Sequence, residues 1–507
     1  MTNLYDLLRQ HFPADRNQTI LETPDGQCMS YAELDAGAGR MARLLAQSGV
    51  EPGDRVAAQI EKSPEALLLY LGVLRCGGVY LPLNTAYKGG EVGYFLSDAE
   101  PRVLVCTPQN EATLRETAEK AGVATVLTLG EAGDGSLLER SRDLDPDFAV
   151  VPREDDDLAA ILYTSGTTGR SKGAMLSHAN LGSNTLTLRE AWGFTADDVL
   201  IHALPVFHTH GLFVATHCVL LSGSRMLFLN RFDADTVIDL LPRATTMMGV
   251  PTFYTRLLAS PRLTREACAH IRLFVSGSAP LLADTFEAFE QRTGHRILER
   301  YGMTETTMNT SNPLEGERRA GTVGFPLPGV EVRVTDEDGK PLPQGEVGVL
   351  EVKGPNVFRG YWRQPEKTAA EFRKDGFFIT GDVAMIDERG YIHIVGRAKD
   401  LIISGGFNVY PKEIELCIDQ IDGVQESAVI GVPHPDFGEA VVAVVKRASG
   451  GAEVSADAIQ STAKAELANF KVPKKVFFVE ELPRNTMGKV QKNLLRDRFK
   501  DSFSSAA

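Results

Sequence analysis

Short apolar runs alternate with helical patterns along roughly the first 327 residues of the chain. Ser30–Leu34 has the order of a capping-box helix start, and Arg55–Ile60 is a strand-like run. Further strand-like runs, separated by helical segments, lie at residues 199–204, 226–229 and 273–277. Because elements that alternate in this way form sheets covered by helices, the sequence predicts an α/β fold.

The pattern changes between Gly329 and Gly396, where short alternating runs are interrupted by Gly, Pro and Asp. This texture predicts a small β-rich subdomain. After Gly396 the chain shows helical patterns at 411–421 and 455–467, and strand-like runs at 428–432, 441–445 and 475–479. We therefore expect a large N-terminal domain at residues 1–396 and a small α+β C-terminal domain at residues 397–507.

Composition and charge narrow the class of protein. The chain has 507 residues, 43% hydrophobic and 24% charged, as in globular enzymes, and its formal charge of −14 argues against nucleic acid or an anionic membrane as partners. Six single cysteines without C-x-x-C spacing, and an N-terminus unlike a secretory signal, favour the cytoplasm. The apolar segment Ala66–Leu83 contains a charge, glycines and a proline, so a core helix and a strand explain it better than a membrane span. The sequence leaves the oligomeric state open.

The segment Leu158–Gly173 is an apolar run that breaks into hydroxyl residues, glycines and one lysine. Glycines let backbone N–H groups approach an anion, hydroxyls add donors, and Lys172 adds a mobile positive charge. The order predicts a loop that holds a phosphate chain. The loop lacks the Walker spacing, which weakens the hypothesis of an ATP-dependent kinase but leaves it open. A flexible linker is the other alternative, and it explains the flanking strand and helix start poorly.

Further motifs follow in a fixed order: Tyr301–Glu305, Thr380–Asp382, Gly396–Arg397 and Pro483–Lys489. With the loop, they resemble the acyl-adenylate-forming superfamily of acyl-CoA synthetases, firefly-type luciferases and peptide-synthetase adenylation domains, from about residue 10 to 500. The resemblance implies two half-reactions. A carboxylate attacks the α-phosphorus of ATP to give an acyl-adenylate and pyrophosphate, and a thiol, here CoA, then attacks the adenylate.

The resemblance also implies roles for individual residues. Lys172 and the loop would hold the β- and γ-phosphates, Thr304 would touch a phosphate, and Glu305 would help to hold Mg²⁺. Asp382 would accept hydrogen bonds from the ribose, and Lys489 would be the catalytic lysine of adenylation. The expected nucleotide site comprises Thr164, Ser165, Gly166, Thr167, Thr168, Gly169, Ser278, Ala279, Pro280, Glu299, Tyr301, Gly302, Met303, Thr304, Asp382, Arg397 and Lys489.

In relatives the small domain rotates between the two half-reactions. Lys399 falls at the family's hinge position, where a residue absorbs a change of backbone angle. The following loop would line the tunnel for the pantetheine arm of CoA. It comprises Ser404, Gly405, Gly406 and Phe407.

The prediction of which carboxylic acid is the substrate depends on Arg300, directly before Tyr301. An unpaired arginine facing an apolar tail is unfavourable, whereas a second carboxylate on the substrate would pair with it. His208 could donate a hydrogen bond to that carboxylate, or it could be a packing histidine. Other candidates for the acid site are Ser278, Arg170, Thr209 and Met308.

This set most resembles malonyl-CoA synthetases, which implies malonate as the acid. A synthetase for methylmalonate or for a short monocarboxylic acid, with Arg300 turned to solvent, remains the alternative. A kinase would release ADP instead of AMP, and a non-catalytic nucleotide-binding protein would not need Lys489, Glu305 and Asp382 together.

Overall fold

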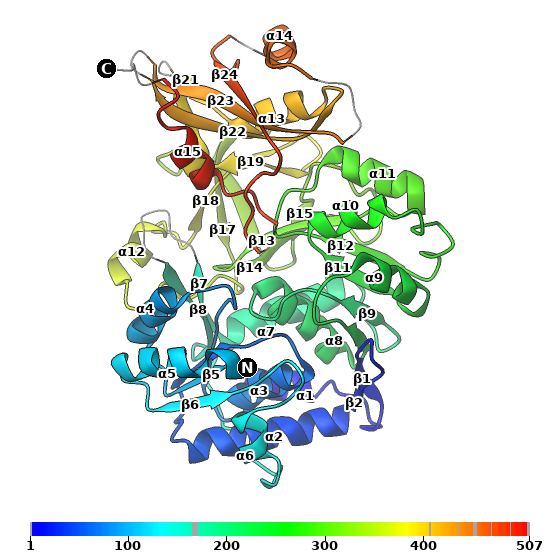
Figure 1. Cartoon of the computed structure of the whole chain (residues 1–507), viewed down its shortest axis with the longest axis vertical. Coiled ribbons are helices and arrows are strands. Elements are labelled where there is room, and N and C mark those ends of the chain that lie inside the picture. The colour runs from blue at the N-terminus through cyan, green and yellow to red at the C-terminus, as the bar shows by residue number, and fades with distance from the viewer. Residues whose placement is uncertain are drawn as a thin grey trace. The chain divides into compact units, whose positions relative to one another are not determined.

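A computed structural model describes residues 3–164, 171–404, 407–434, 437–449, 454–467, 469–486 and 488–503, with backbone only at 407 and 408. The chain forms two compact units (Figure 1). The first unit is Met1–Glu331 with Val352–Phe378, and the second is Val332–Glu351 with Ile379–Ala507. The predicted α/β fold is confirmed by this mixture of helices and sheets.

One sheet of the first unit has the strand order β6-β5-β3-β4-β7-β8, and only β8 runs antiparallel to its neighbour. Its strands are β3 (Arg55–Gln59), β4 (Val79–Pro82), β5 (Val103–Cys106), β6 (Thr125–Thr128), β7 (Leu158–Thr164) and β8 (Lys172–Ser177). The associated helices are α2 (Tyr31–Gln47), α3 (Pro64–Arg75), α4 (Gly89–Ala99), α5 (Glu111–Lys120) and α6 (Ser136–Ser141). Phe95, Leu96 and Leu114 bury α4 and α5 against the sheet. Helix α3 and strand β4 account for the apolar segment 66–83, as expected.

The second sheet of this unit has the order β15-β14-β13-β12-β11-β9-β10-β1-β2, with a parallel centre from β1 to β13. Its strands are β1 (Thr19–Glu22), β2 (Cys28–Ser30), β9 (Val199–His202), β10 (Arg225–Phe228), β11 (Thr246–Gly249), β12 (Leu273–Ser276), β13 (Leu298–Met303), β14 (Thr307–Ser311) and β15 (Phe325–Pro326). The carboxyl ends of parallel strands meet at one edge, so the segments that follow β9, β12 and β13 come together.

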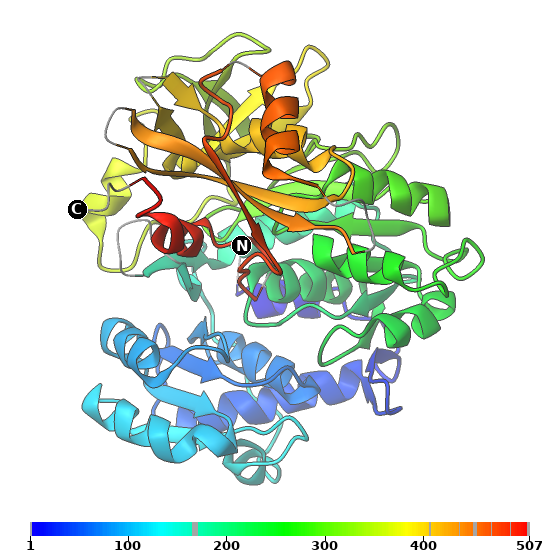
Figure 2. The same ribbon diagram turned by 45° about the horizontal axis from the view of Figure 1, so that its top comes forward.

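Helices α9, α10 and α11 cover one face of this second sheet and are coloured green in Figure 2. Tyr254, Phe286 and Phe289 fill the core beneath them. The covering helices are α9 (Ala234–Leu240), α10 (Pro251–Ala259) and α11 (Ala283–Thr293), and the rest of the unit adds α1 (Leu4–Arg9), η1 (Pro108–Asn110), α7 (His178–Ala191), the π-helix η2 (His210–Thr216), α8 (His217–Ser222), η3 (Leu241–Arg243) and α12 (Pro365–Ala370).

The second unit contains a sheet of order β16-β17-β18-β19 and a sheet of order β21-β20-β23-β22, with β24 parallel to β23. The strands are β16 (Glu331–Thr335), β17 (Val347–Lys353), β18 (Phe378–Ile386), β19 (Ile392–Arg397), β20 (Ile402–Ser404), β21 (Phe407–Val409), β22 (Val424–His434), β23 (Gly438–Arg447) and β24 (Lys475–Val479). The helices are η4 (Ala398–Asp400), α13 (Pro411–Asp419), α14 (Ala456–Glu466) and α15 (Lys492–Phe499). Ile414 and Ile459 anchor α13 and α14 on one face, and Leu495 anchors α15 in a separate core.

The two compact units do not divide the chain at the expected boundary between residues 396 and 397. Residues 332–351 and 379–396, which we assigned to the N-terminal domain, belong to the second unit. Strands β18 and β19 pair with each other, and this pairing keeps both strands in one body. The hinge near Lys399 concerns movement, and it stays a prediction.

Candidate active site

Strands β7 and β8 are an antiparallel pair joined by the expected phosphate loop. Thr164, which ends β7, is the direct partner of Lys172, which begins β8. The loop residues Ser165, Gly166, Thr167, Thr168, Gly169 and Arg170 lie outside the described residues. After β8, Ser177 caps helix α7, so the loop leads into a helix as expected. The strand register therefore holds Thr164 and Lys172 at the two ends of one loop.

Two side chains link Lys172 to Glu305. Lys172 Nζ lies 3.1 Å from Glu371 Oε1 and 4.0 Å from the centroid of the Tyr361 ring. The Tyr361 hydroxyl lies 2.7 Å from Glu371 Oε2 and 3.1 Å from Glu305 Oε1. The Thr164 hydroxyl also donates a hydrogen bond to Glu305 Oε1, at 3.4 Å. A cation, a carboxylate and a hydroxyl are thus brought together at the ends of the loop, as a bound polyphosphate and its counter-ion require.

The electrostatics of these contacts depend on two carboxylates, those of Glu371 and Glu305. Burial raises the pKa of Glu371, but hydrogen bonds from Tyr361, Lys367 and Lys172 outweigh burial, so the net pKa is lowered. Burial and the negative charge of Glu305 raise the pKa of Tyr361, which keeps its hydroxyl protonated as a donor. Sequence reasoning missed Tyr361 and Glu371, because their segment carries none of the residues that mark a phosphate loop.

Glu305 lies in the connection between β13 and β14, directly after Thr304. The connection is tight, because a Cβ atom at Gly302 would lie 1.8 Å from the carbonyl oxygen of Thr307. Only glycine fits at that approach. Tyr301 and Met303 are half-buried beside it. The hairpin thus explains why the expected nucleotide residues 301–305 form one continuous motif.

Arg300 is an expected acid-site residue with a deeply buried charge. It lies on β13, its exposed fraction is 3%, and burial lowers its pKa to about 9. Within the described residues, its Nε and Nη2 atoms have no hydrogen-bond partner. A Cβ atom at Gly277 would lie 2.4 Å from the Arg300 Cζ atom, so the guanidinium group fills the space that glycine leaves. A buried cation with unpartnered donors has the chemistry to bind an anion from outside the chain.

Two histidines lie near this guanidinium group. Burial and the positive charge of Arg300 lower the pKa of His208 to about 4, and they also lower the pKa of His210. His208 Nδ1 accepts from the backbone N–H of His210 at 3.2 Å, so the neutral His208 ring carries its proton on Nε2. His210 Nδ1 lies 3.2 Å from Ser278 Oγ. Both rings are therefore neutral hydrogen-bonding groups.

Other polar atoms here also lack partners. His210 Nε2 and Thr209 Oγ1 are buried with no hydrogen-bond partner among the described residues. Ser278 has φ of +70°, a strained backbone for a residue other than glycine, and such strain clusters at functional sites. His210 was absent from our expected site, although the His-x-His order around Thr209 could have indicated it. Met308 is buried on β14, which pairs with the strand of Arg300, and its direct partner there is Gly302.

The second unit holds another group of expected residues. Asp382 and Arg397 are direct partners on β18 and β19, and their side chains form an ion pair of 2.7 Å. Lys489 is held in a turn, because its backbone N–H donates to Asn485 Oδ1 at 2.9 Å. Although Lys489 is an exposed residue, desolvation of its ammonium group and the charges of Arg397 and Lys399 lower its pKa. The three cationic side chains thus lie close enough to repel one another.

The expected CoA loop is described only in part. Ser404 is buried and pairs with Phe407 across the β20–β21 hairpin. Gly405, Gly406 and the side chain of Phe407 lie outside the described residues. Lys399 is an exposed residue of the short helix η4, and desolvation of its ammonium group lowers its pKa.

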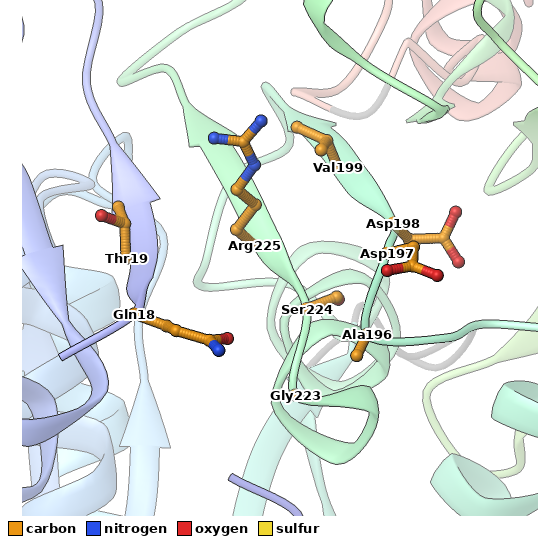
Figure 3. A pocket seen from close by; sticks show the side chains of 9 residues that line it. All are labelled: Gln18, Thr19, Ala196, Asp197, Asp198, Val199, Gly223, Ser224 and Arg225. Carbon is orange, nitrogen blue, oxygen red and sulfur yellow. The ribbon is translucent and has the colours of Figure 1, made fainter. Parts of the chain in front are cut away.

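A hollow of about 360 Å³ opens near the amino ends of β9 and β10 (Figure 3). Asp198 and Arg225 are among its lining residues. Asp198 is neutralised by Arg272, which contacts both of its oxygens at 2.7 and 2.8 Å. Among the described residues that line it, the hollow therefore offers no unpaired buried charge.

Two further features, a metal site and a membrane span, can be assessed for the described residues. Among the described residues, no group of three or more His, Cys, Asp and Glu side chains could hold a metal ion alone. Glu305 and Thr164 do offer oxygen atoms of the kind that Mg²⁺ prefers when phosphate oxygens complete its shell. None of the helices in the described ranges has the length and apolar character needed to cross a membrane.

The loop ends, the Glu305 hairpin and the buried anion site define an enzyme that binds a nucleotide and an acid. The chain belongs to the family of AMP-binding enzymes: the AMP-binding enzyme model matches residues 9–362, and the model of the C-terminal domain matches residues 413–489. It is an acid–thiol ligase of the CoA-ligase type that this family includes.

The chain is similar to a feruloyl-CoA synthase of an Amycolatopsis species, with 37% identity over 94% of each chain. A malonate–CoA ligase of Arabidopsis thaliana is 34% identical, and the match covers 93% of this chain and 85% of that protein. Among solved structures, ATP-bound MatB from Rhodopseudomonas palustris has 60% identity and a TM-score of 0.97, with 99% of each chain covered. ATP and CoA are therefore the substrates that the family supports.

Proposed function

We propose that the protein is a malonyl-CoA synthetase, which converts malonate, ATP and CoA into malonyl-CoA, AMP and pyrophosphate. The buried Arg300, whose Nε and Nη2 atoms have no protein partner in the described structure, is the observation that carries the proposal. One carboxylate of malonate reacts with ATP and the other pairs with Arg300. The similarity to a malonate–CoA ligase and to MatB supports this reading.

The neutral state of His208 and His210 fits a dicarboxylate substrate. A second carboxylate has one negative charge, and Arg300 alone balances it. Neutral histidines add hydrogen-bond donors without adding charge, and His208 carries its proton on the Nε2 atom. Ser278 and Thr209 supply hydroxyl groups beside them. Met308 and Arg170 remain proposed members of the acid site.

Adenylation brings two anions together, so the nucleotide residues must reduce their repulsion. We assign Lys172 and Thr164 to the β- and γ-phosphates, together with Thr304. Glu305 would hold Mg²⁺, whose charge would offset that of the phosphates when it is bound. This assignment is supported by the contacts that connect Glu305 to Lys172 through Tyr361 and Glu371.

The second unit supplies the remaining roles. Asp382 would accept from the ribose hydroxyls while Arg397 holds it in place. Lys489 would neutralise charge between the acid and the α-phosphate during adenylation and then withdraw, as the C-terminal domain at residues 397–507 turns about Lys399 and presents the Ser404–Phe407 loop to CoA. The lone cysteines are all free, which accords with a cytoplasmic location.

A substrate panel tests the proposal. Purified protein with ATP, Mg²⁺ and CoA is given malonate, methylmalonate, acetate, octanoate or ferulate, and pyrophosphate release, AMP and the CoA thioester are measured. We expect AMP and malonyl-CoA, with kcat/KM for malonate at least about a hundredfold above that for acetate, because acetate leaves a buried cation unpaired. A preference for a monocarboxylic acid would refute the malonate assignment, and release of ADP would refute the adenylation chemistry.

A further inference from the structure

Lys62 is a buried lysine that no step of the proposed reaction uses. Its exposed fraction is 6%, and burial lowers its pKa well below the ordinary value. Its Nζ atom lies 2.7 Å from the carbonyl oxygen of His202, 2.9 Å from His202 Nδ1 and 4.2 Å from the centroid of the Phe228 ring. These three contacts equal in number the N–H bonds of an ammonium group. Both hydrogen-bond contacts that hold the Lys62 amine are thus made with His202.

The contacts of His202 determine which ring nitrogen carries its proton. Burial and the charge of Lys62 lower the pKa of His202, so the ring is neutral. His202 Nε2 lies 3.0 Å from the carbonyl oxygen of Gly211. A carbonyl oxygen can only accept, so Nε2 carries the hydrogen and Nδ1 accepts from Lys62. Lys62 therefore orients His202 as a donor to Gly211.

Gly211 lies in the first turn of the π-helix His210–Thr216. Its carbonyl oxygen also accepts from Thr216 Oγ1 at 2.9 Å. A Cβ atom at Gly211 would lie 2.1 Å from the carbonyl oxygen of Pro205, so the turn is packed tightly against the chain that precedes it. Single-turn π-helices occur often at functional sites. The start of this helix is therefore held from two sides.

The same turn carries the neutral histidines of the acid site. His210 is the first residue of the π-helix, and His208 precedes it by two residues. Both rings feel the charge of Arg300, and His210 contacts Ser278. A displacement of the turn would therefore move the hydrogen-bonding groups that surround Arg300.

We propose that Lys62 and His202 are positioning residues of the acid site. By holding the carbonyl oxygen of Gly211, they keep His208 and His210 beside Arg300 and so set the affinity for the acid without touching it. The identity of the acid rests on the proposed function, but the positioning does not. The proposal gives a role to a buried amine whose burial is otherwise unfavourable.

Three variants test the positioning. Lys62→Met keeps the aliphatic stem and removes the donors, His202→Leu removes both ring nitrogens, and His202→Gln keeps an amide N–H that can reach the Gly211 carbonyl. We expect Lys62→Met and His202→Leu to raise the KM for malonate by about three- to tenfold, as loss of a buried hydrogen bond would, with the KM for ATP unchanged. His202→Gln should retain most of the wild-type KM.

Tyr70→Phe is the matched control. It removes another buried hydrogen bond, of 2.8 Å to His217 Nε2, from the helix that follows the π-helix. It should lower the melting temperature and leave the KM for malonate unchanged. An unchanged ratio of the malonate and ATP KM values in Lys62→Met and His202→Leu, or an equal change in Tyr70→Phe, overturns the proposal.

Two provisions keep the test decisive. Should Lys62→Met fail to fold, Thr216→Val removes the hydrogen bond of 2.9 Å to the Gly211 carbonyl and the contact of 3.1 Å between Thr216 Oγ1 and His202 Nε2. An unchanged KM for malonate in that variant overturns the proposal. The wild type is first assayed on the acid panel. Should another acid be the substrate, the malonate assignment fails, and the same KM comparison made with that acid still supports or overturns the role of Lys62.

Discussion

Lys172 Nζ lies 3.1 Å from Glu371 Oε1, and Lys367 Nζ contacts the same oxygen at 2.9 Å. One carboxylate thus balances two lysines beside the phosphate loop. Phosphate oxygens bind ammonium groups in the same way as carboxylate oxygens do. In the proposed reaction, where Lys172 binds the phosphates of ATP, Glu371 would compete with them for Lys172.

Replacing Glu371 with Gln should strengthen ATP binding. The substitution removes the competing negative charge and leaves both lysines to attract phosphate. A partly exposed ion pair contributes up to about 1 kcal/mol, so we expect the Kd for ATP to fall by about two- to fivefold. Pyrophosphate should inhibit the variant more strongly for the same reason. Isothermal titration calorimetry with ATP and product-inhibition kinetics measure the two effects.

Glu366→Gln is the control for this prediction. Glu366 is exposed on helix α12, whose C-cap residue is Glu371, and the substitution removes the same charge from the chain. It should leave ATP binding unchanged. Weaker ATP binding in Glu371→Gln would show instead that the carboxylate orients Lys172 and does not compete for it.

Arg300→Met should separate stability from activity. The guanidinium group is buried, and two of its nitrogen atoms lack partners within the described part of the chain, so an apolar side chain of similar length should stabilise the protein by about 1–3 kcal/mol. The same variant should lose at least about a hundredfold in kcat/KM for malonate, because the second carboxylate has no partner. Denaturant unfolding and steady-state kinetics measure both effects, and the KM for ATP should not change.

Arg272→Met is the comparison variant, because it should lower the stability that Arg300→Met should raise. Arg272 pairs with the buried Asp198 through two contacts, so its removal leaves that carboxylate unpaired. We expect a loss of about 3–5 kcal/mol in stability. A stability loss of similar size in Arg300→Met would mean that Arg300 has a structural partner, and would argue against an anion site.

The sequence predicts strands and motif residues, which depend on neighbouring residues, and it misses contacts between residues that are distant in the chain. The strand-like run at 475–479 is predicted correctly, because a short apolar sequence of β-branched and aromatic residues forms a strand of the same bounds, Lys475–Val479. Arg300 is recognisable because it adjoins a motif. Glu371 and Lys62 are not, because their partners Lys172 and His202 are far away in the chain and no spacing rule connects them. The orientation of a histidine ring likewise follows from its contacts.

Acid should destabilise the first unit through His217. Its side chain is fully buried, burial lowers its pKa to about 3, and Tyr70 donates to its Nε2 atom at 2.8 Å. The folded pKa lies below the unfolded pKa of about 6.5, so the unfolded state takes up the proton and stability is lost as pH falls from 6.5. Between pH 6.5 and pH 5 the loss due to this residue should be about 2 kcal/mol.

Comparison of the wild type with His217→Gln isolates this effect. The variant has no titrating group at the site, so its stability should fall less between pH 6.5 and pH 5. Unfolding is followed at each pH by intrinsic fluorescence, with exposed His270→Gln as the control that keeps the wild-type acid sensitivity. Parallel curves for the wild type and His217→Gln would show that the buried ring does not remain neutral in the folded state.

Gly277→Ala should weaken malonate binding without touching the substrate. The added Cβ atom would lie 2.4 Å from Arg300 Cζ and 2.6 Å from its Nε atom, so the guanidinium group must move. We expect kcat/KM for malonate to fall by more than about tenfold, because the geometry of a charge-assisted pair is specific. In the Arg300→Met background the same substitution should cost much less, since the flexible thioether adapts to the methyl group. A double-mutant cycle on kcat/KM measures this coupling, and strictly additive effects would show that Gly277 acts on the site by a route other than Arg300.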